Sequence, residues 1–503
     1  MDHTDVSRFA ATFQAFLDQV VEAARSAPDG AVPVAERIHT FLGQDPVTLP
    51  VITEPFPTFQ LATVQVALDR LLQRPGVQHE LLGIAGDGRE HESLTEILET
   101  SRRHGRFWIG SVDYTSVPVA IDDDMTCVRF GLYLIDDGTR RLTVLLRGGD
   151  PLHGSPAMLE ILTGSMPDAK AWLAELRAER ATSDVLRGQV LSFEPSEFEP
   201  GAGPVRFHRR PQLDRDDVVL PEGVLERVER QVIGIARHRD RLRREGRHLK
   251  RGVLLYGPPG TGKTHTVRYL TGVLPDFTVV LLAGPAIRFV SEACALARNL
   301  QPALIVLEDC DLVAEDRSFT PEGNPLLFTV LDEMEGLADD ADVCFLLTTN
   351  RADLIDTALA QRPGRVDLAV EVPLPDPPGR RRLFEIYGRG ISVQPAEVDT
   401  VVERTEGVPA SFIKEMTRRA TLLAAERDAD DTTAADVLAA IDELTAAQEA
   451  LTRRLLGSGD DHEPDIDEID DDPGDIDDEF ETPATDRGWF AYAPRSGQRY
   501  RGR

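Results

Sequence analysis

The sequence predicts a chain of the α/β class, built around a parallel sheet of five strands with helices on both faces. Three observations support this fold. Short runs that are apolar at every position alternate with helical segments between residues 217 and 378. A glycine-rich motif, GPPGTGKT, joins the first of these runs to a helix, and two acids end the third run, in the stretch LIVLEDCD. Strands that are apolar throughout are typical of parallel sheets covered on both sides.

Length and composition limit the possible classes of protein. The 503 residues allow two or three domains, and no stretch approaches the ~18 uninterrupted apolar residues of a membrane span. The four cysteines are far apart, which favours a reducing compartment over a disulfide framework. The first residues lack the apolar core of a signal peptide. We therefore expect a cytoplasmic protein that contacts no membrane.

The net charge of −31 is distributed unevenly. Residues 460–481 hold 14 Asp or Glu and no Lys or Arg, so we expect residues 457–503 to form an acidic, disordered tail. Residues 237–251 are an exception, with eight Arg or Lys against two acids. We interpret this stretch as a solvated helix face at a subunit junction in preference to a nucleic-acid patch, because the acidic balance argues against nucleic acid as a partner.

Residues 1–192 predict a separate N-terminal domain of the α/β or α+β class. Residues 4–26 have apolar side chains at helical spacing. The stretches FWIGSV, TCVRFGLYLID and RLTVLLR indicate strands, with a hairpin turn at DDGTRR. MLEILTG and AKAWLAELRAERA return to helical spacing. The segment rich in Pro, Glu and Gly that follows predicts a linker over residues 193–216.

Five candidate strands define the central module over residues 217–378. They are GVLLYG, TVVLLAG, ALIVLED, VCFLLTTN and LAVEVPLP, with helical segments between them. Residues 379–456 are rich in Ala, Leu, Glu and Arg, and we expect them to form an all-helical lid subdomain.

The motif GPPGTGKT predicts a phosphate-binding loop, because it follows a strand and leads into a helix. Glycines allow the backbone to wrap around phosphates, and the N–H groups at a helix N-terminus favour anions. Lys263 would reach the β- and γ-phosphates of ATP, and the Thr264 hydroxyl would bind Mg²⁺. The predicted nucleotide-binding residues are Gly257, Pro258, Pro259, Gly260, Thr261, Gly262, Lys263, Thr264 and His265.

Residues 217–445 resemble the AAA-type members of the AAA+ ATPases, whose fold is a P-loop α/β module followed by a helical lid. The resemblance rests on GPPGTGKT, PALIVLEDCD, LLTTN and DTALAQRPGRVDLAVEVPLPD. The last of these segments is the most discriminating, because it is similar to the second region of homology that separates AAA-type members from other P-loop proteins.

The resemblance implies a role for each polar residue at the ends of these strands. It puts Glu308 at the Mg²⁺ position, Asp309 at the position that polarises the attacking water, and Asn350 at the sensor that orients this water. The order Glu then Asp is reversed relative to most of the family and is found in a subgroup. Arg362 and Arg365 resemble arginine fingers supplied to a neighbouring subunit, which implies a homo-oligomeric ring, a hexamer by analogy.

Some positions depart from the family pattern. Leu368 follows Asp367 where another Arg is frequent, and Pro409-Ala410-Ser411-Phe412 matches the lid motif only loosely. Phe289 occupies the place of the aromatic residue that grips substrate in the ring pore, but the usual Gly-Glu after it is missing. We favour a buried or interface position for Phe289 over a pore position.

These features together predict an ATP hydrolase that forms a ring and remodels or unfolds a protein substrate. The N-terminal domain would recognise the substrate or an adaptor. One alternative is a nucleotide-gated assembly scaffold with negligible turnover, and a second is a nucleic-acid-directed motor, which the charge disfavours. No HExxH, Cys/His cluster or GxSxG motif indicates a fused protease or esterase.

Overall fold

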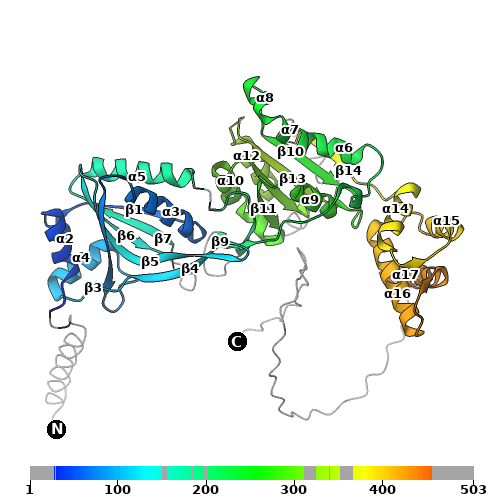
Figure 1. Cartoon of the computed structure of the whole chain (residues 1–503), viewed down its shortest axis with the longest axis horizontal. Helices are drawn as coiled ribbons and strands as arrows, with labels where there is room; N and C mark the ends of the chain where they lie inside the picture. Colours follow the sequence, from blue (N-terminus) through cyan, green and yellow to red (C-terminus); the bar gives the residue numbers. More distant parts are fainter. Residues whose placement is uncertain are drawn as a thin grey trace, which may run out of the picture. The chain divides into compact units, whose positions relative to one another are not determined.

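The structure is a computed structural model that describes residues 28, 30–149, 156–183, 185–195, 202–310, 325–338, 340–351 and 366–455. The predicted opening helix at 4–26 and the acidic tail at 457–503 lie outside the described residues. The chain divides into two compact units, Met1–Pro373 and Leu374–Arg503. The first unit contains two seven-stranded sheets, drawn in blue to cyan and in green in Figure 1.

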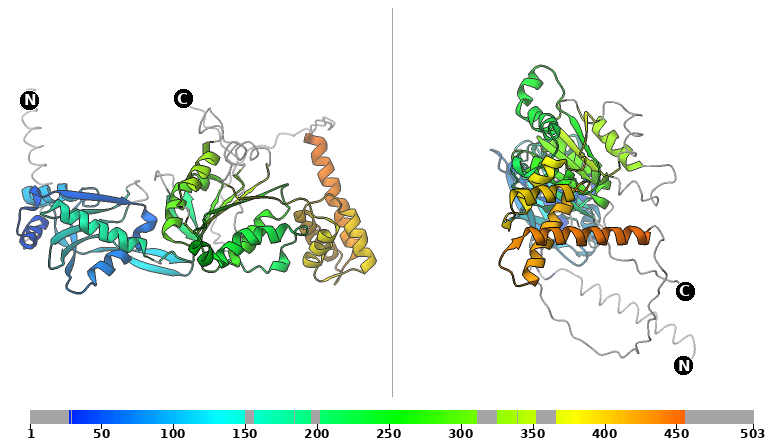
Figure 2. Two further views of the ribbon diagram at one scale, coloured as in Figure 1. Left: turned by 90° about the horizontal axis from the view of Figure 1, so that it is seen from above. Right: turned by 90° about the vertical axis from the view of Figure 1, so that its right-hand side faces the viewer.

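The first sheet is antiparallel and has two helices on each face (Figures 1 and 2). Its strand order is β1-β7-β6-β5-β2-β3, with β4 paired to β5. The strands are β1 (Val51–Phe56), β2 (Gln78–Ala85), β3 (Trp108–Gly110), β4 (Asp113–Ala120), β5 (Asp123–Asp136), β6 (Arg141–Arg147) and β7 (Ala157–Leu162). The helices are α2 (Val34–Leu42), α3 (Leu61–Leu72), α4 (Leu94–His104) and α5 (Met166–Ala181).

Alternate side chains of the strands belong to two different hydrophobic cores, one on each face of the first sheet. Tyr133 and Ile135 of β5 pack in a cluster with α3 and α5, whereas Leu132 and Leu134 pack with α2 and α4. Successive side chains of a strand point to opposite faces, so one strand serves both cores. The predicted strands and the hairpin at DDGTRR are confirmed as β3, β5 and β6.

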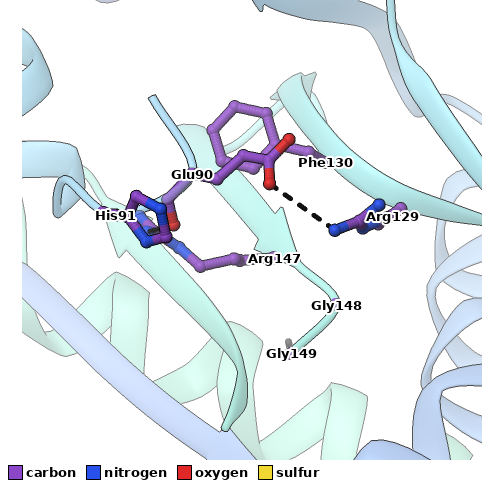
Figure 3. Close-up of a pocket in the computed structure, with 7 residues that line it drawn as sticks. All are labelled: Glu90, His91, Arg129, Phe130, Arg147, Gly148 and Gly149. Carbon is purple, nitrogen blue, oxygen red and sulfur yellow. Dashed lines mark hydrogen bonds and ion pairs between the residues drawn. The ribbon is translucent and has the colours of Figure 1, made fainter. Parts of the chain in front are cut away.

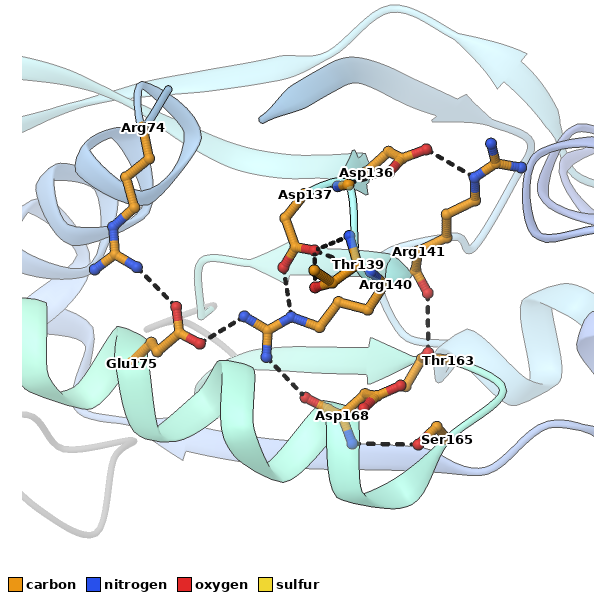
Figure 4. A network of polar contacts seen from close by, with 11 residues as sticks. Arg74, Asp136, Asp137, Thr139, Arg140, Arg141, Thr163, Ser165, Asp168 and Glu175 are labelled. Atoms are coloured by element: carbon orange, nitrogen blue, oxygen red, sulfur yellow. Dashed lines mark hydrogen bonds and ion pairs between the residues drawn. The ribbon is translucent and has the colours of Figure 1, made fainter. Parts of the chain in front are cut away.

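The β5–β6 hairpin is tied to α5 by a network of charged side chains (Figure 4). Arg140 donates hydrogen bonds of 2.5 Å to both Asp137 and Glu175, and Arg74 donates to the same Glu175. Burial raises the pKa of Asp137, but hydrogen bonds from Thr139 and Arg140 outweigh it and lower this pKa to about 2. The hairpin therefore has a fixed position over the helix.

One segment of the domain has a different structure from the one its sequence pattern indicates. The stretch MLEILTG, predicted as helical, forms strand β7 instead. Nearly every residue of β7 is buried, because the strand lies between β1 and β6 with helices above and below it. A short run that is apolar throughout fits either a buried strand or a buried helix, and periodicity alone does not separate the two.

The second sheet contains the five predicted strands, all parallel, in the order β14-β10-β13-β12-β11. These strands are β10 (Arg251–Tyr256), β11 (Thr278–Ala283), β12 (Ala303–Glu308), β13 (Val343–Thr349) and β14 (Leu368–Glu371). Helices α10 (Val290–Asn299) and α12 (Pro325–Glu335) pack against one face of the sheet in a shared hydrophobic core. Helix α6 (Val224–Glu229) contacts β14, and α9 (Lys263–Gly272) contacts β12 and β13.

Two further strands extend this sheet beyond β11, within and just before the segment predicted as a linker. Strand β8 (Val190–Pro195) pairs in parallel with β11, and β9 (Ala202–Phe207) pairs with β8 in the antiparallel sense. Phe193 is 3% exposed and its ring lies 5.2 Å from Phe59 and 6.1 Å from Phe289. Some of the Pro, Gly and Glu residues that suggested a linker lie within these two strands, so the average composition concealed the buried Val190, Leu191 and Phe193 of β8.

The second unit is a small helical subdomain, described here by itself. Its helices are α14 (Pro377–Tyr387), α15 (Pro395–Arg404), α16 (Ala410–Glu426) and α17 (Ala434–Leu455). A pair of two-residue strands, β15 (Ile391–Ser392) and β16 (Thr432–Thr433), interrupts the predicted all-helical pattern. Within the described parts of the chain, no helix has the length and apolar character needed to cross a membrane.

A buried ion pair joins the first residue of β10 to the residue before β13. Arg251 Nη1 lies 2.9 Å from Asp342 Oδ1, and the side chains are 0% and 3% exposed. Arg239 Nη1 lies 3.7 Å from the other oxygen of Asp342. Asp342 therefore supplies the negative charge beside two arginines at this end of the sheet.

We expect Asp342→Asn to lower the free energy of unfolding by about 3–5 kcal/mol, because it leaves the buried Arg251 without its counter-charge. The matched control is Asp442→Asn, whose partner Arg404 is exposed, and it should cost at most ~1 kcal/mol. Urea unfolding of the full-length protein, followed by far-UV circular dichroism, measures both losses. Equal losses in the two variants would contradict a structural role for the buried pair.

Candidate functional site

The loop between β10 and α9 has the shape of a phosphate cradle. β10 ends at Tyr256 and α9 begins at Lys263. Gly257 and Gly262 have φ angles of +143° and +108°, which L-residues with a side chain rarely adopt. A Cβ on Gly257 would lie 2.3 Å from the carbonyl oxygen of Val372, so this position also requires glycine for space. The glycines of the motif are thus explained by backbone geometry.

Lys263 lies over this loop and is almost completely buried. Its Nζ donates hydrogen bonds of 2.8 Å to the carbonyl oxygens of Gly257 and Pro258, and the residue is 5% exposed. Gly262 precedes the helix and supplies no side-chain cap for its first N–H groups. Uncapped N–H groups and the helix dipole favour an anion at this end of α9. The loop therefore fits a phosphate group.

The other residues of the motif divide into exposed and structural positions. Pro258, Pro259, Gly260 and Thr264 are exposed at the loop. The Thr261 hydroxyl is buried and donates to the Pro258 carbonyl at 2.9 Å, which holds the turn.

His265, predicted to contact the nucleotide, forms a hydrogen bond to the protein backbone. Its Nε2 donates to the carbonyl oxygen of Asp217 at 3.1 Å, at the end of η3 (Arg215–Asp217). His265 thus connects α9 to the segment that enters the module.

Two acids lie where β12 ends. Every residue of β12 is buried, and Glu308 at its end is 5% exposed. Burial, and then the charge of the adjacent Asp309, raise the pKa of Glu308 to about 7, while Arg268 of α9 lowers it. A cation close to this buried carboxyl group would stabilise its charged form.

Asp309 has an unusual backbone conformation, with a φ angle of +50°. Its N–H donates to the Thr348 hydroxyl at 3.1 Å, and its Oδ1 accepts a long hydrogen bond of 3.5 Å from Asn350 Nδ2. Thr348 and Asn350 lie at the end of β13, which pairs with β12. The parallel sheet therefore brings Asp309 and Asn350 together, as the family resemblance implies.

The left-handed backbone of Asp309 gives a physical reason for the order Glu then Asp. Asp and Asn tolerate positive φ better than other residues with a side chain, because their short polar groups hydrogen-bond locally. Glu lacks this advantage, so the order Asp then Glu would put the less tolerant residue at the strained position. Thr348, which holds this conformation, was not identified from the sequence; the only signal was its place in the strand-ending Thr-Thr-Asn.

The side chains at this edge fit a magnesium ion in their chemistry. Carboxylate and hydroxyl oxygens are the ligands that Mg²⁺ prefers, usually one or two of them together with phosphate oxygens and water. The Glu308 carboxylate and the exposed Thr264 hydroxyl are such donors. Among the described residues, no group of three or more His, Cys, Asp or Glu could hold a metal ion on its own.

The remaining predicted residues lie elsewhere or outside the described chain. Phe289 ends η5 (Gly284–Phe289), is 3% exposed and packs in the core beneath α10, which confirms the buried position favoured from the sequence. Arg362 and Arg365 lie outside the described residues.

The N-terminal domain contains a pocket too small for a substrate. It is lined by Glu90, Arg129, Phe130 and Arg147 among others, and its volume of about 20 Å³ suits roughly one water molecule (Figure 3). Arg147 donates to the Glu90 carbonyl at 2.6 Å and to the Glu160 carboxylate at 3.0 Å, so it serves the fold. The pocket does not compete with the phosphate loop as a candidate site.

Comparison with known protein families identifies the same region of the chain. Residues 253–374 match the AAA family, the ATPase family associated with various cellular activities. This segment begins in β10 and ends just beyond β14, so it includes the phosphate loop, both acids and Asn350.

Three relatives show how far the similarity extends. ATP-dependent zinc metalloprotease FtsH 2 of Sphaerobacter thermophilus is 34% identical over 52% of this chain and 40% of its own length. Proteasome-activating nucleotidase of Thermococcus kodakarensis is 28% identical over 53% of this chain and 70% of its own length. The nucleotidase of Methanopyrus kandleri is 30% identical over 52% and 63%. The chain thus spans less than half of the first relative and about two thirds of the other two.

We expect the Asp309→Gly variant to have a free energy of unfolding about 1 kcal/mol higher than that of Asp309→Ala, because only glycine adopts positive φ without strain. At ordinary helical or strand positions the order is the reverse. Thermal unfolding of Asp309→Gly and Asp309→Ala tests this difference. Asp428, with a φ of +54° and no part in the site, is the matched control and should show the same order. A more stable Ala variant at position 309 would show that the strain is absent.

Proposed function

We propose that this chain, whose residues 253–374 match the AAA family, hydrolyses ATP and uses the energy to remodel or unfold a protein substrate. One observation carries the proposal. Asp309 and Asn350 contact each other at the sheet edge where β10 leads into the phosphate loop. A nucleotide held by the loop would place its terminal phosphate near a carboxylate and an amide able to orient water.

Each residue of the edge has a separate task in this proposal. The loop and Lys263 bind the phosphates, and Thr264 and Glu308 would hold Mg²⁺. When bound, Mg²⁺ neutralises phosphate charge and orients the terminal phosphate. Asp309 accepts a proton from the attacking water, and Asn350 fixes the direction of the Asp309 carboxylate and of that water. Thr348 positions Asp309 through its backbone N–H.

The relatives support a protein as the substrate class. One is named an ATP-dependent zinc metalloprotease and another a proteasome-activating nucleotidase, so both names combine nucleotide use with protein breakdown. This chain has no HExxH motif, and we propose the remodelling activity without a metalloprotease activity. We assign recognition of the substrate or an adaptor to the N-terminal domain and place the protein in the cytoplasm.

We further propose that the active form is a ring, most simply a hexamer. The support is the sequence after Asn350, where Arg362 and Arg365 have the spacing of arginine fingers. An arginine finger stabilises charge on the transferred phosphoryl group of a neighbouring subunit, so a single copy would be incomplete.

Phosphate release by the purified full-length protein tests the enzyme proposal. Lys263→Ala should abolish nucleotide binding and turnover together. Asp309→Asn should keep ATP binding and lower turnover at least ~10²-fold, because Asn keeps the backbone conformation but accepts no proton. Lys414→Ala and Asp428→Asn, which change the same residue types at exposed positions, should have wild-type activity.

Two results of this assay would contradict the proposal. Equal, background phosphate release from the wild type, Lys263→Ala and Asp309→Asn would instead indicate a nucleotide-gated scaffold. Stimulation of turnover by single-stranded DNA or RNA, lost at high salt, would indicate a nucleic-acid-directed motor.

A mixing experiment tests whether Arg365 acts on the neighbouring subunit. Arg365→Ala and Asp309→Asn should each be inactive alone but bind ATP. Mixed rings should regain part of the activity, because intact sites in one variant receive intact arginines from the other. The control mixture of Arg365→Ala with the double variant Asp309→Asn/Arg365→Ala should stay inactive. Collapse of ATP affinity in Arg365→Ala alone would rule out the proposed role in trans.

A further inference from the structure

The segment before β10 is a strongly basic and exposed part of the molecule. We call residues 237–248 the basic arm; it includes α8 (Arg239–Arg244) and follows the three-residue helix α7 (Ile235–Arg237). In Figure 1, α8 stands out from the second sheet, the one that contains β10. The exposed arginines of the arm are Arg237, Arg241, Arg243, Arg244 and Arg247.

Most of these charges have no counter-charge in the structure. Arg241 pairs with Glu245, whereas Arg237, Arg243, Arg244 and Arg247 form no ion pair with any described residue. Some exposed arginines elsewhere do have partners; Arg177, for example, pairs with Glu54 and Arg418 with Glu415. In a chain with a net charge of −31, acids are abundant, so four arginines without an ion pair within residues 237–247 form a distinct positive surface.

A groove lies beside the arm and shares one of its arginines. Its volume is about 530 Å³, and Arg243 lines it together with Arg298, Gln301, Gly336, Ala338 and Ala341, with one acid, Asp340. Gln301 and Ala341 lie just before β12 and β13, so the groove is at the edge of the sheet where the parallel strands begin. The phosphate loop is at the opposite edge, so an occupant of the groove would not displace a nucleotide.

We propose that the basic arm and this groove bind the acidic run at residues 460–481 of this same chain. The run has 14 acids and no Lys or Arg, which complements an arm with four unpaired arginines. Ile466, Ile469, Ile476 and Phe480 are spaced among the acids. Side chains of this size fit a groove lined partly by Gly and Ala, so the run offers both charge and apolar anchors.

The position of the run in the chain also favours it as the occupant. α17 ends at Leu455, and residues 456–503 follow it. A segment of the same chain that reaches its site has an effective concentration of order mM, so even weak intrinsic binding is enough to keep that site occupied. Free nucleic acid has no such advantage and is repelled by the net charge of the chain. The proposal does not depend on the ATPase activity, because binding can be measured without nucleotide.

The test compares full-length proteins in their binding of a fluorescent peptide with the sequence of residues 460–481. The first protein is the native chain. The second is a tail-neutral chain, in which Asn and Gln replace the 14 acids of the run. The third adds Arg237→Gln, Arg243→Gln, Arg244→Gln and Arg247→Gln to the tail-neutral chain. The fourth is the matched control, with the ion-paired and exposed Arg102, Arg177, Arg209 and Arg418 changed to Gln instead.

We expect the peptide to bind the tail-neutral chain and the matched control equally well, with an affinity that falls as salt is added. The native chain should bind it at least about tenfold more weakly, because the attached run competes at its high effective concentration. The protein without the four arm arginines should show no binding, with unchanged circular dichroism. Equal affinity of the native and tail-neutral chains, or binding that survives loss of the four arginines, would overturn the proposal. Tighter binding of a 22-nucleotide single-stranded DNA than of the peptide to the tail-neutral chain would overturn it in favour of a nucleic-acid surface.

Discussion

The parallel pairing of β10, β13 and β12 is the constraint on which the site depends. β13 lies between the other two strands, so Tyr256, Glu308 and Thr349 end at one edge of the sheet. Residues that are far apart in the chain thereby become neighbours. The pairing is stabilised by strands buried along their whole length and by the ion pair of Arg251 with Asp342 at the opposite end. Loss of this register would separate the phosphate loop from the acids.

Strain at Asp309 is the local feature that this framework makes possible. A left-handed conformation costs free energy for a residue with a side chain, and here the Thr348 hydroxyl compensates by accepting its N–H. The conformation turns the chain as it leaves β12 and brings the Asp309 carboxylate to Asn350. The reversed order of the two acids is therefore consistent with the backbone, since the residue that tolerates positive φ stands where positive φ occurs.

The two edges of the same sheet differ in charge and in exposure. The edge where the strands end contains a buried lysine and two acids and fits a nucleotide with its metal ion. The edge where they begin contains the exposed arginines of the basic arm. β8 and β9 extend the sheet in the direction of the N-terminal domain, where Phe193 packs against Phe59. One sheet thus connects the phosphate loop, a basic surface and the preceding domain.

The sequence by itself determined the five parallel strands and the phosphate loop, and the family resemblance implied that Asp309 and Asn350 act at one site. The strands and the loop follow from local patterns: apolar runs of strand length and glycines at fixed spacing. Tertiary structure alone decided that MLEILTG is a strand and that residues 190–195 and 202–207 join the sheet. It alone decided that His265 contacts Asp217, and that Thr348 supports a left-handed Asp309. These outcomes depend on which segments lie opposite one another, and a pairing partner far along the chain leaves no mark on the local pattern.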